Sequence, residues 1–129
     1  LKGLMSVDDA KKAVDIGASA IMLSNHGGRQ LDGSRSPFDQ LPAIVDAVGG
    51  KIEIIVDGGI RRGTHVLKAL ALGATACSFG KGFLFALGAG GQKGVEMVLQ
   101  RMKDEIRRDM ILLGCKSMKE LNPSKIAYR

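Results

Sequence analysis

The chain has 129 residues, of which 45% are hydrophobic, and this length is enough for one modest domain with a hydrophobic core. Aromatic residues make up 4% and Trp is absent, which argues against a base-stacking surface for single-stranded nucleic acid; the net charge of +6 comes from scattered basic residues, so we expect no nucleic-acid partner. No apolar run approaches the roughly 20 residues that a membrane-spanning helix needs.

The two cysteines, Cys77 and Cys115, match neither a zinc-binding spacing nor a disulfide framework. This usage is typical of a reducing compartment and predicts a cytoplasmic protein, with a peroxisomal location or peripheral membrane association of the complete protein as alternatives. The sequence begins with Leu1 instead of Met, and residues 1–3 resemble the end of a strand. We therefore expect the chain to be a piece of a longer protein.

Strand-like and helical segments alternate along the chain. After the strand end at residues 1–3, apolar runs bounded by glycine or polar residues predict strands at 20–24, 52–56 and 74–79. Apolar residues at helical spacing, each group followed by glycine, predict helices within 7–16, 41–48, 65–72 and 95–113. Ser6 and Thr64 are the expected caps of the first and third helices, Ser117 is expected to cap a last short turn, and a short apolar turn is expected before Val95.

This alternation predicts an α/β fold with parallel strands joined by right-handed crossovers. The strands are apolar on both faces, as expected when helices cover one face and a packed interior covers the other. Polar and glycine-rich residues follow the strands at 24–29, 57–62 and 80–81. Because barrels and doubly wound sheets bind ligands at the carboxyl ends of their strands, we expect the functional site there.

The segment 24–32, SNHGGRQLD, combines a base with a group that binds acids. His26 changes charge near neutral pH and suits proton abstraction, and Arg29 can hold a carboxylate through two parallel hydrogen bonds. The two glycines between them allow a sharp turn beside a ligand. Removal of a proton next to a carboxylate would need this pair, although a polar surface loop with an ordinary histidine would carry the same residues.

A second group of residues predicts a phosphate site. Residues 57–64, DGGIRRGT, and residues 80–82, GKG, follow consecutive strands. Backbone N–H groups freed by glycine, next to cationic side chains at a helix start, form a cradle for phosphate. Each cluster alone is typical of a tight turn, and their pairing favours the cradle. Asp57 is expected to bind a polyol hydroxyl; alternatively, it only stabilises its own turn. Arg62 is expected to be solvated and to lie outside the site.

The motifs together resemble the FMN-dependent α-hydroxy acid dehydrogenase/oxidase family, whose familiar members are glycolate oxidase and flavin-linked L-lactate dehydrogenase. The resemblance is carried in order by residues 2–3, 24–32, 57–63, 68–74 and 91–94. It implies that residues 1–129 are the C-terminal part of a single barrel domain, the C-terminal half of a (β/α)8 TIM barrel with surrounding helices.

The resemblance also implies roles for individual residues. His26 matches the catalytic base, which also contacts the substrate, and Arg29 matches the clamp on the substrate carboxylate. Lys2 matches the lysine that stabilises the reduced flavin. The other cofactor-binding positions are Ser24, Asp57, Gly58, Gly59, Arg61, Gly80 and Lys81. The cofactor implied is FMN, and no metal is implied.

Three departures from the family pattern stand out. Gly80-Lys81-Gly82 replaces the usual Gly-Arg-Pro, which keeps a charge but loses a planar fork. His65 stands where Asp is more frequent, and we interpret it as a local variation. The family's remaining active-site aspartate, second arginine and tyrosines come from the N-terminal half; the sole tyrosine here is Tyr128, at the tail.

The predicted function is therefore FMN-dependent oxidation of a small L-2-hydroxy acid, lactate- or glycolate-like, to the 2-oxo acid, as part of a longer chain. His26 takes a proton either from the 2-hydroxyl, with hydride transfer, or from the α-carbon. The alternatives are a catalytically inactive half-barrel fragment and another FMN- or phosphate-binding barrel enzyme. We expect the chain alone to be inactive and to form a homo-oligomer.

Overall fold

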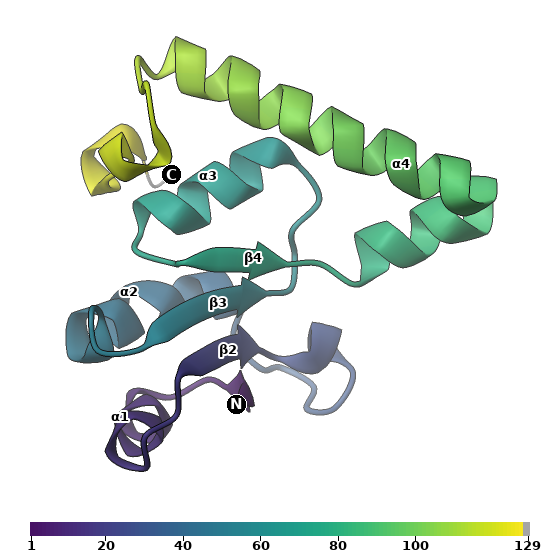
Figure 1. Cartoon of the computed structure of the whole chain (residues 1–129). Helices are drawn as coiled ribbons and strands as arrows, with labels where there is room; N and C mark the ends of the chain where they lie inside the picture. The colour runs from purple at the N-terminus through teal and green to yellow at the C-terminus, as the bar shows by residue number, and fades with distance from the viewer. Residues whose placement is uncertain (128–129) are drawn as a thin grey trace.

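The computed structural model describes residues 1–127, so Tyr128 lies outside the described residues. Within the described residues, four strands form one sheet in the order β1-β2-β3-β4 (Figure 1), and neighbouring strands run parallel. The strands are β1 (Lys2–Leu4), β2 (Ala20–Ser24), β3 (Glu53–Asp57) and β4 (Ala76–Ser78). The parallel α/β prediction is confirmed, and β2 has the predicted bounds.

Between residues 1 and 127, four α-helices follow the strands in turn. They are α1 (Val7–Asp15), α2 (Pro37–Val48), α3 (Gly63–Ala71) and α4 (Lys81–Leu112). Short 3₁₀ turns lie at His26–Gly28, Met118–Glu120 and Pro123–Lys125. In the described part of the chain, no helix combines the length and apolar character needed to cross a membrane.

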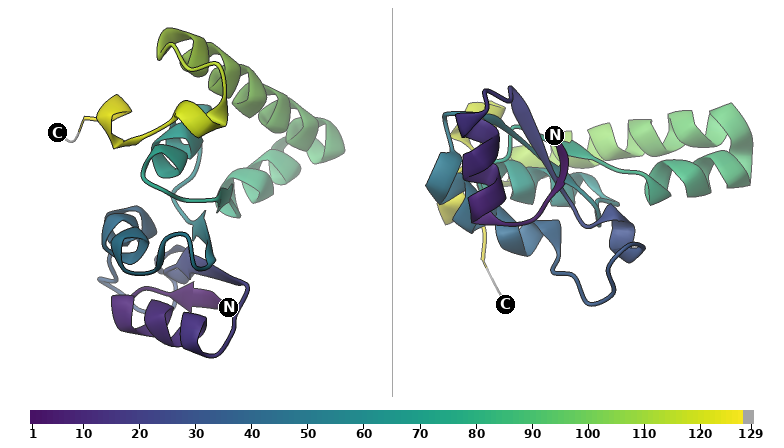
Figure 2. Two further views of the ribbon diagram at one scale, coloured as in Figure 1. Left: turned by 60° about the vertical axis from the view of Figure 1, so that its left-hand side comes forward. Right: turned by 90° about the horizontal axis from the view of Figure 1, so that it is seen from below.

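The hydrophobic core lies between the sheet and helices α1, α2 and α3, whereas α4 extends away from the sheet in Figure 2. Alternate strand residues point to opposite faces. Ile21 and Leu23 of β2 and Ile54 and Val56 of β3 are at most 1% exposed and pack in one cluster with residues of α1, α2 and α3. The other face of the same strands, which includes Met22 and Ile55, is half-buried.

The predicted helix caps agree in part with the structure. The Ser6 hydroxyl oxygen accepts the Asp9 N–H at 3.1 Å, as predicted for the cap of α1. Ser36 caps α2 in the same way, through the Asp39 N–H at 3.2 Å. The predicted cap Thr64 is wrong, because α3 already begins at Gly63 and its first amide donates to a carboxylate of α4. Ser117 occupies the cap position of its turn but makes no side-chain cap bond.

The short turn predicted before Val95 is also wrong. The segment is helical from Lys81, and α4 consists of two arms, 81–89 and 92–112, that meet at a break where Gly91 has φ 56° and ψ −146°. A Cβ atom on Gly94 would collide with the Ala86 carbonyl oxygen, so the arms touch directly behind the break. Figure 2 shows this hairpin projecting away from the sheet. The sequence did not predict a helix over the first arm, residues 81–89, because its apolar residues form a continuous run without helical spacing.

Register brings the functional ends of the strands together. Ser24 lies opposite Asp57, and Asp57 lies opposite Ser78. Strand β3 ends one residue later than predicted and β4 is shorter than predicted, at three residues. The polar segments that follow the three strands therefore start side by side at one edge of the sheet.

Candidate functional site

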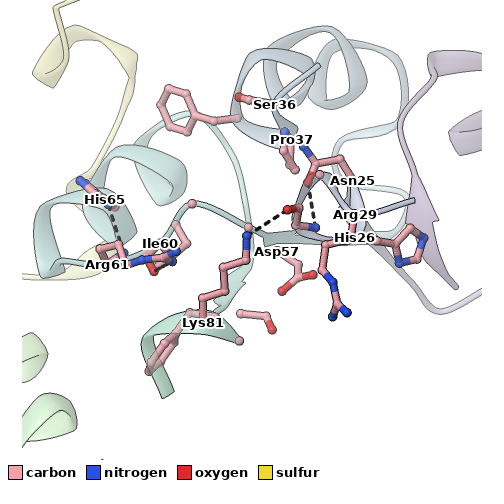
Figure 3. Close-up of a pocket in the computed structure, with 18 of the residues that line it drawn as sticks. Asn25, His26, Arg29, Ser36, Pro37, Asp57, Ile60, Arg61, His65 and Lys81 are labelled. Atoms are coloured by element: carbon pink, nitrogen blue, oxygen red, sulfur yellow. Dashed lines mark hydrogen bonds between the residues drawn. The ribbon is translucent and has the colours of Figure 1, made fainter. Parts of the chain in front are cut away.

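A cavity of about 950 Å³ opens at the carboxyl edge of the sheet. Its lining includes Lys2 at the start of β1, Asp57 at the end of β3, and residues that follow β2, β3 and β4, among them His26, Arg29, Arg61 and Lys81. Figure 3 shows labelled side chains from the loops after β2, β3 and β4 surrounding one space. Apart from Ser24, the predicted site residues all line this cavity, which is of the size expected for a cofactor-sized ligand.

Asp57 is the centre of a polar network on the cavity floor. Its Oδ2 accepts the Ser24 hydroxyl at 2.6 Å and pairs with the Lys2 ammonium at 2.7 Å. The Ser24 side chain is 1% exposed, so this hydroxyl lies beneath the cavity and not in its lining. The sequence placed these three residues at one site but did not predict that they bind one another.

Ionisation of Asp57 follows from this network. Burial raises the pKa of the carboxyl, but hydrogen bonds from Lys2, Ser24 and Ser78 and the charge of Lys2 together outweigh burial, and the pKa lies below its ordinary value. Asp57 is therefore a carboxylate at neutral pH. It can accept hydrogen bonds from the hydroxyls of a bound ligand while it holds the Lys2 ammonium at the cavity.

The backbone of His26 has a conformation that residues other than glycine rarely adopt. Its φ is 55°, in the left-handed region, and its N–H donates to the Ser24 hydroxyl oxygen at 3.1 Å. Asn25 supports the same turn by accepting the Gly27 N–H at 3.1 Å. Strained backbone of this kind is concentrated at functional sites. The loop thus fixes the histidine backbone through the Asp57 network, and leaves the imidazole exposed at the cavity.

Arg29 leaves the same loop at the end of the 3₁₀ turn. Figure 3 shows its guanidinium pointing in a different direction from the His26 imidazole. Both side chains are exposed and both line the cavity. A ligand held by the guanidinium can therefore approach the imidazole from within the same space.

The loop from Gly58 to Arg62 forms another wall. Gly58 and Gly59 have φ of 121° and 73°, conformations that favour glycine, and Ile60 anchors the loop at 3% exposure. The Arg61 guanidinium donates to the Ile60 carbonyl at 2.9 Å. Arg62 does not line the cavity; its guanidinium pairs instead with the buried Glu105 carboxylate at 2.8 Å, a contact that the expectation of a solvated side chain did not include.

Lys81 connects two of the walls. Its ammonium donates to the Gly27 carbonyl oxygen at 3.1 Å, across from the loop that carries His26. Lys81 is also the first residue of α4, where the backbone amides have no partner within the helix. Positive charge and free N–H groups therefore coincide at this end of the cavity.

Sequence reasoning missed some lining residues. His65 accepts the Arg61 N–H on Nδ1 at 3.2 Å and lines the cavity, so it is more than a local variation. Pro37 and Leu84, near the starts of α2 and α4, also line it. Their position in the sequence, directly after the polar loops, could have indicated that they line the cavity.

The cavity fits FMN. The carboxylate of Asp57 and the ammonium of Lys2 suit a polyol and a polar ring edge, and Arg61, Lys81 and the start of α4 suit a phosphate. In the described residues, no cluster of three or more His, Cys, Asp or Glu side chains could hold a metal ion. Fold and site together define a flavin-nucleotide-binding α/β protein.

Comparison with known proteins identifies the family. The model of the family described as FMN-dependent dehydrogenase matches residues 1–128, and this chain belongs to that family. An L-lactate oxidase from Nostoc sp. is 50% identical over 124 residues, which make up 96% of this chain and 34% of that protein. A pre-mycofactocin synthase from Mycobacterium tuberculosis is 51% identical over 126 residues, covering 98% of this chain and 32% of that protein.

Comparison with solved structures supports the same family assignment. The crystal structure of mandelate oxidase with benzoyl-formic acid matches with a TM-score of 0.89 and 51% identity, covering 92% of this chain and 36% of the other. The predicted family, the predicted fold as part of a (β/α)8 barrel and FMN as the cofactor of the family are confirmed. The chain spans about a third of the length of the curated relatives that it matches.

Proposed function

We propose that this chain carries the base, the carboxylate clamp and the phosphate cradle of an FMN-dependent enzyme that oxidises a small L-2-hydroxy acid to the 2-oxo acid. One observation carries the proposal: a single cavity holds His26 and Arg29 of the β2 loop together with Asp57, Arg61 and Lys81 of the next loops. The names of an L-lactate oxidase and a mandelate oxidase among the similar proteins support this reaction class.

Each residue has a proposed role. The Arg29 guanidinium holds the substrate carboxylate, which orients C2 of the substrate in the cavity. Oxidation removes two electrons and two protons, and His26 takes one of these protons, either from the 2-hydroxyl or from the α-carbon. FMN, when bound, would supply the acceptor for the electron pair and for the second proton. Lys2 stabilises negative charge at the ring edge, where its pairing with Asp57 fixes the ammonium.

The remaining predicted residues hold the cofactor. Asp57 accepts hydrogen bonds from the ribityl chain, and Ser24 positions Asp57 from below. The loop glycines Gly58 and Gly59, together with Arg61, Gly80 and Lys81, surround the phosphate. We place all of residues 1–129 in the C-terminal part of one barrel domain that forms homo-oligomers. The free cysteines, Cys77 and Cys115, favour a cytoplasmic location.

A second candidate is another reaction of an FMN-binding barrel enzyme. The pre-mycofactocin synthase is as similar to this chain as the oxidases are, so the same phosphate cradle is compatible with a synthase. The two candidates share the FMN site and differ in what Arg29 binds. A 2-hydroxy acid carboxylate is required in the first and not in the second.

The test uses the full-length protein with FMN. We expect oxidation of L-lactate, glycolate or L-mandelate, and we expect His26→Gln to lower kcat by about 10²–10⁴-fold with FMN still bound, which is the usual contribution of a general base. Arg29→Met should raise KM for the 2-hydroxy acid while a control substitution, Lys93→Met on the exposed face of α4, changes neither constant. Normal turnover of His26→Gln would refute the proposal, and FMN binding without turnover of any 2-hydroxy acid would favour the second candidate.

A further inference from the structure

The start of α3 is fastened to α4 by one buried carboxylate, Glu105, which is 5% exposed. Its Oε2 accepts the backbone N–H of Gly63 at 2.8 Å. Its Oε1 accepts the Nε of Arg62 at 2.8 Å and the Nε of Arg101 at 3.2 Å. Three donors thus converge on one side chain, and two of them belong to consecutive residues at the end of the β3–α3 loop.

The backbones of α3 and α4 also touch at this point. A Cβ atom on Gly63 would lie 2.7 Å from the Glu105 Cβ, 2.7 Å from the Ile106 nitrogen and 2.8 Å from the Met102 carbonyl oxygen. Real Cβ atoms do not approach so closely, so the two helices meet here without a side chain between them. The position of Gly63 is therefore defined by α4 as well as by its own helix.

The loop that leads to Gly63 is the wall of the cavity that carries Arg61. At its other end, Asp57 is held by Lys2 and Ser24. Ile60 is buried, and Arg61 is tied to its neighbours through its own N–H and through its guanidinium. Glu105 itself does not line the cavity. It acts on the loop from behind.

We propose that Glu105 is a positioning residue for the phosphate-binding loop: by holding Arg62 and Gly63, it keeps Arg61 and the Gly58–Gly59 backbone in the geometry that receives the phosphate of the cofactor. This inference rests on the proposed function, in which that loop binds the FMN phosphate. A loop held in its binding geometry loses less conformational freedom when the ligand arrives, and affinity rises accordingly. Release of the loop should therefore weaken phosphate binding in particular.

A purely structural role of Glu105 makes a different prediction. Loss of helix packing would disturb the whole cavity and weaken every flavin alike. Riboflavin has the same ring and ribityl chain as FMN but no phosphate, so comparison of the two ligands separates the roles. Glu105→Gln preserves the shape of the side chain, yet its amide nitrogen cannot accept a hydrogen bond from Arg62 or Gly63.

The experiment measures dissociation constants for FMN and riboflavin by flavin fluorescence in the full-length apoprotein. We expect Glu105→Gln to weaken FMN binding about tenfold, the equivalent of one well-placed hydrogen bond, and to change riboflavin binding less than twofold. Glu105→Asp keeps the carboxylate on a side chain that is one methylene shorter, and it should weaken FMN binding by a smaller factor. This variant replaces Glu105→Gln in the test if Glu105→Gln does not fold. Asp104→Asn, next to it on the exposed side of α4, is the control and should change neither constant.

Arg61→Ala separates failure of this inference from failure of the proposed function. If Arg61→Ala weakens FMN binding and Glu105→Gln does not, or if Glu105→Gln weakens both flavins equally, the positioning role of Glu105 is overturned while the phosphate loop stands. If Arg61→Ala leaves FMN binding unchanged, the assignment of the loop to phosphate is itself wrong, and the inference falls with it.

Discussion

The imidazole of His26 rests against the backbone of Gly3, where a Cβ atom would lie 2.8 Å from Nε2. Gly3 belongs to β1 and has a φ of 96°. The proposed base therefore needs a residue without a side chain on the neighbouring strand. Because the atom in the way is the far end of the histidine side chain, the ring can rotate to relieve the clash. We conclude that Gly3 determines where the imidazole points.

Gly3→Ala should accordingly impair catalysis more than folding. We expect kcat for the 2-hydroxy acid to fall by about 10²-fold, the effect of a catalytic group misplaced by roughly 1 Å, with FMN still bound. Steady-state kinetics of the full-length protein would measure it. Gly17→Ala is the matched control: Gly17 has a φ of 76°, but an added methyl group there would meet no atom within 4 Å, so this variant carries the backbone strain alone. Equal losses of turnover in the two variants would show that backbone strain, and not the imidazole, is responsible.

Lys81 provides a test of the phosphate end of the cavity. Lys81→Arg should bind FMN at least as tightly as the native protein, because a guanidinium retains the charge and adds a planar fork. Lys81→Glu should lose FMN, since a repulsion replaces an attraction at short range. Fluorescence titration would give the three dissociation constants. Lys93→Glu makes the same charge reversal at an exposed position of α4 and should leave FMN binding intact. Identical constants for all Lys81 variants would remove Lys81 from the phosphate site.

The sequence was most informative where local chemistry determines structure. The strand at Ala20–Ser24 was predicted with its bounds because its apolar run is followed at once by polar residues, and the cap at Ser6 because its bond to Asp9 is local. The cavity residues of the β2 and β3 loops were found because parallel strands align their carboxyl ends. These features need only short-range patterns and the rules of parallel sheets.

Long-range pairing could not be predicted in the same way. Lys2 and Asp57 are 55 residues apart, and each was assigned to the ligand instead of to the other. Glu105 lies 42 residues from Gly63, and an acidic residue within a helix gives no sign that it will satisfy the first amide of another helix. The cap at Thr64 was wrong for this reason, because a tertiary contact replaced the local one.

The isolated 129-residue chain should associate. In the described residues, β1 and β4 are the outer strands of an open sheet, and Phe85 of the first arm of α4 is 68% exposed beside other exposed apolar side chains. Unpaired strand edges and large apolar patches favour association. Light scattering should detect dimers or larger species, and Phe85→Ser should reduce them more than Ile16→Ser, a substitution of an equally exposed residue just after α1. A stable monomer that oxidises lactate or glycolate would contradict this expectation.

Glu105 should make the stability of the protein depend on pH. The Gly63 N–H lowers the pKa of its carboxyl, burial opposes this, and hydrogen bonds from Arg101 and Arg62 and the charge of Arg62 reinforce the lowering, so the pKa lies below its ordinary value. The unfolded chain then takes up a proton more readily than the folded one. The stabilisation is therefore fully present above the ordinary glutamate pKa of about 4.3 and is lost as the pH falls through the lower value of the folded state.

The comparison of native protein with Glu105→Gln isolates this effect, because the glutamine does not titrate while Asp57 and the other acidic groups remain in both proteins. We expect the native protein to have the higher urea midpoint by a constant margin between about pH 6 and 8, and this margin to shrink progressively below about pH 4.3. Urea unfolding of the full-length apoprotein at stepped pH would measure the margin. A margin that persists at pH values well below about 4, or that grows on acidification, would mean that the ionised Glu105 carboxylate is not the source of the stabilisation.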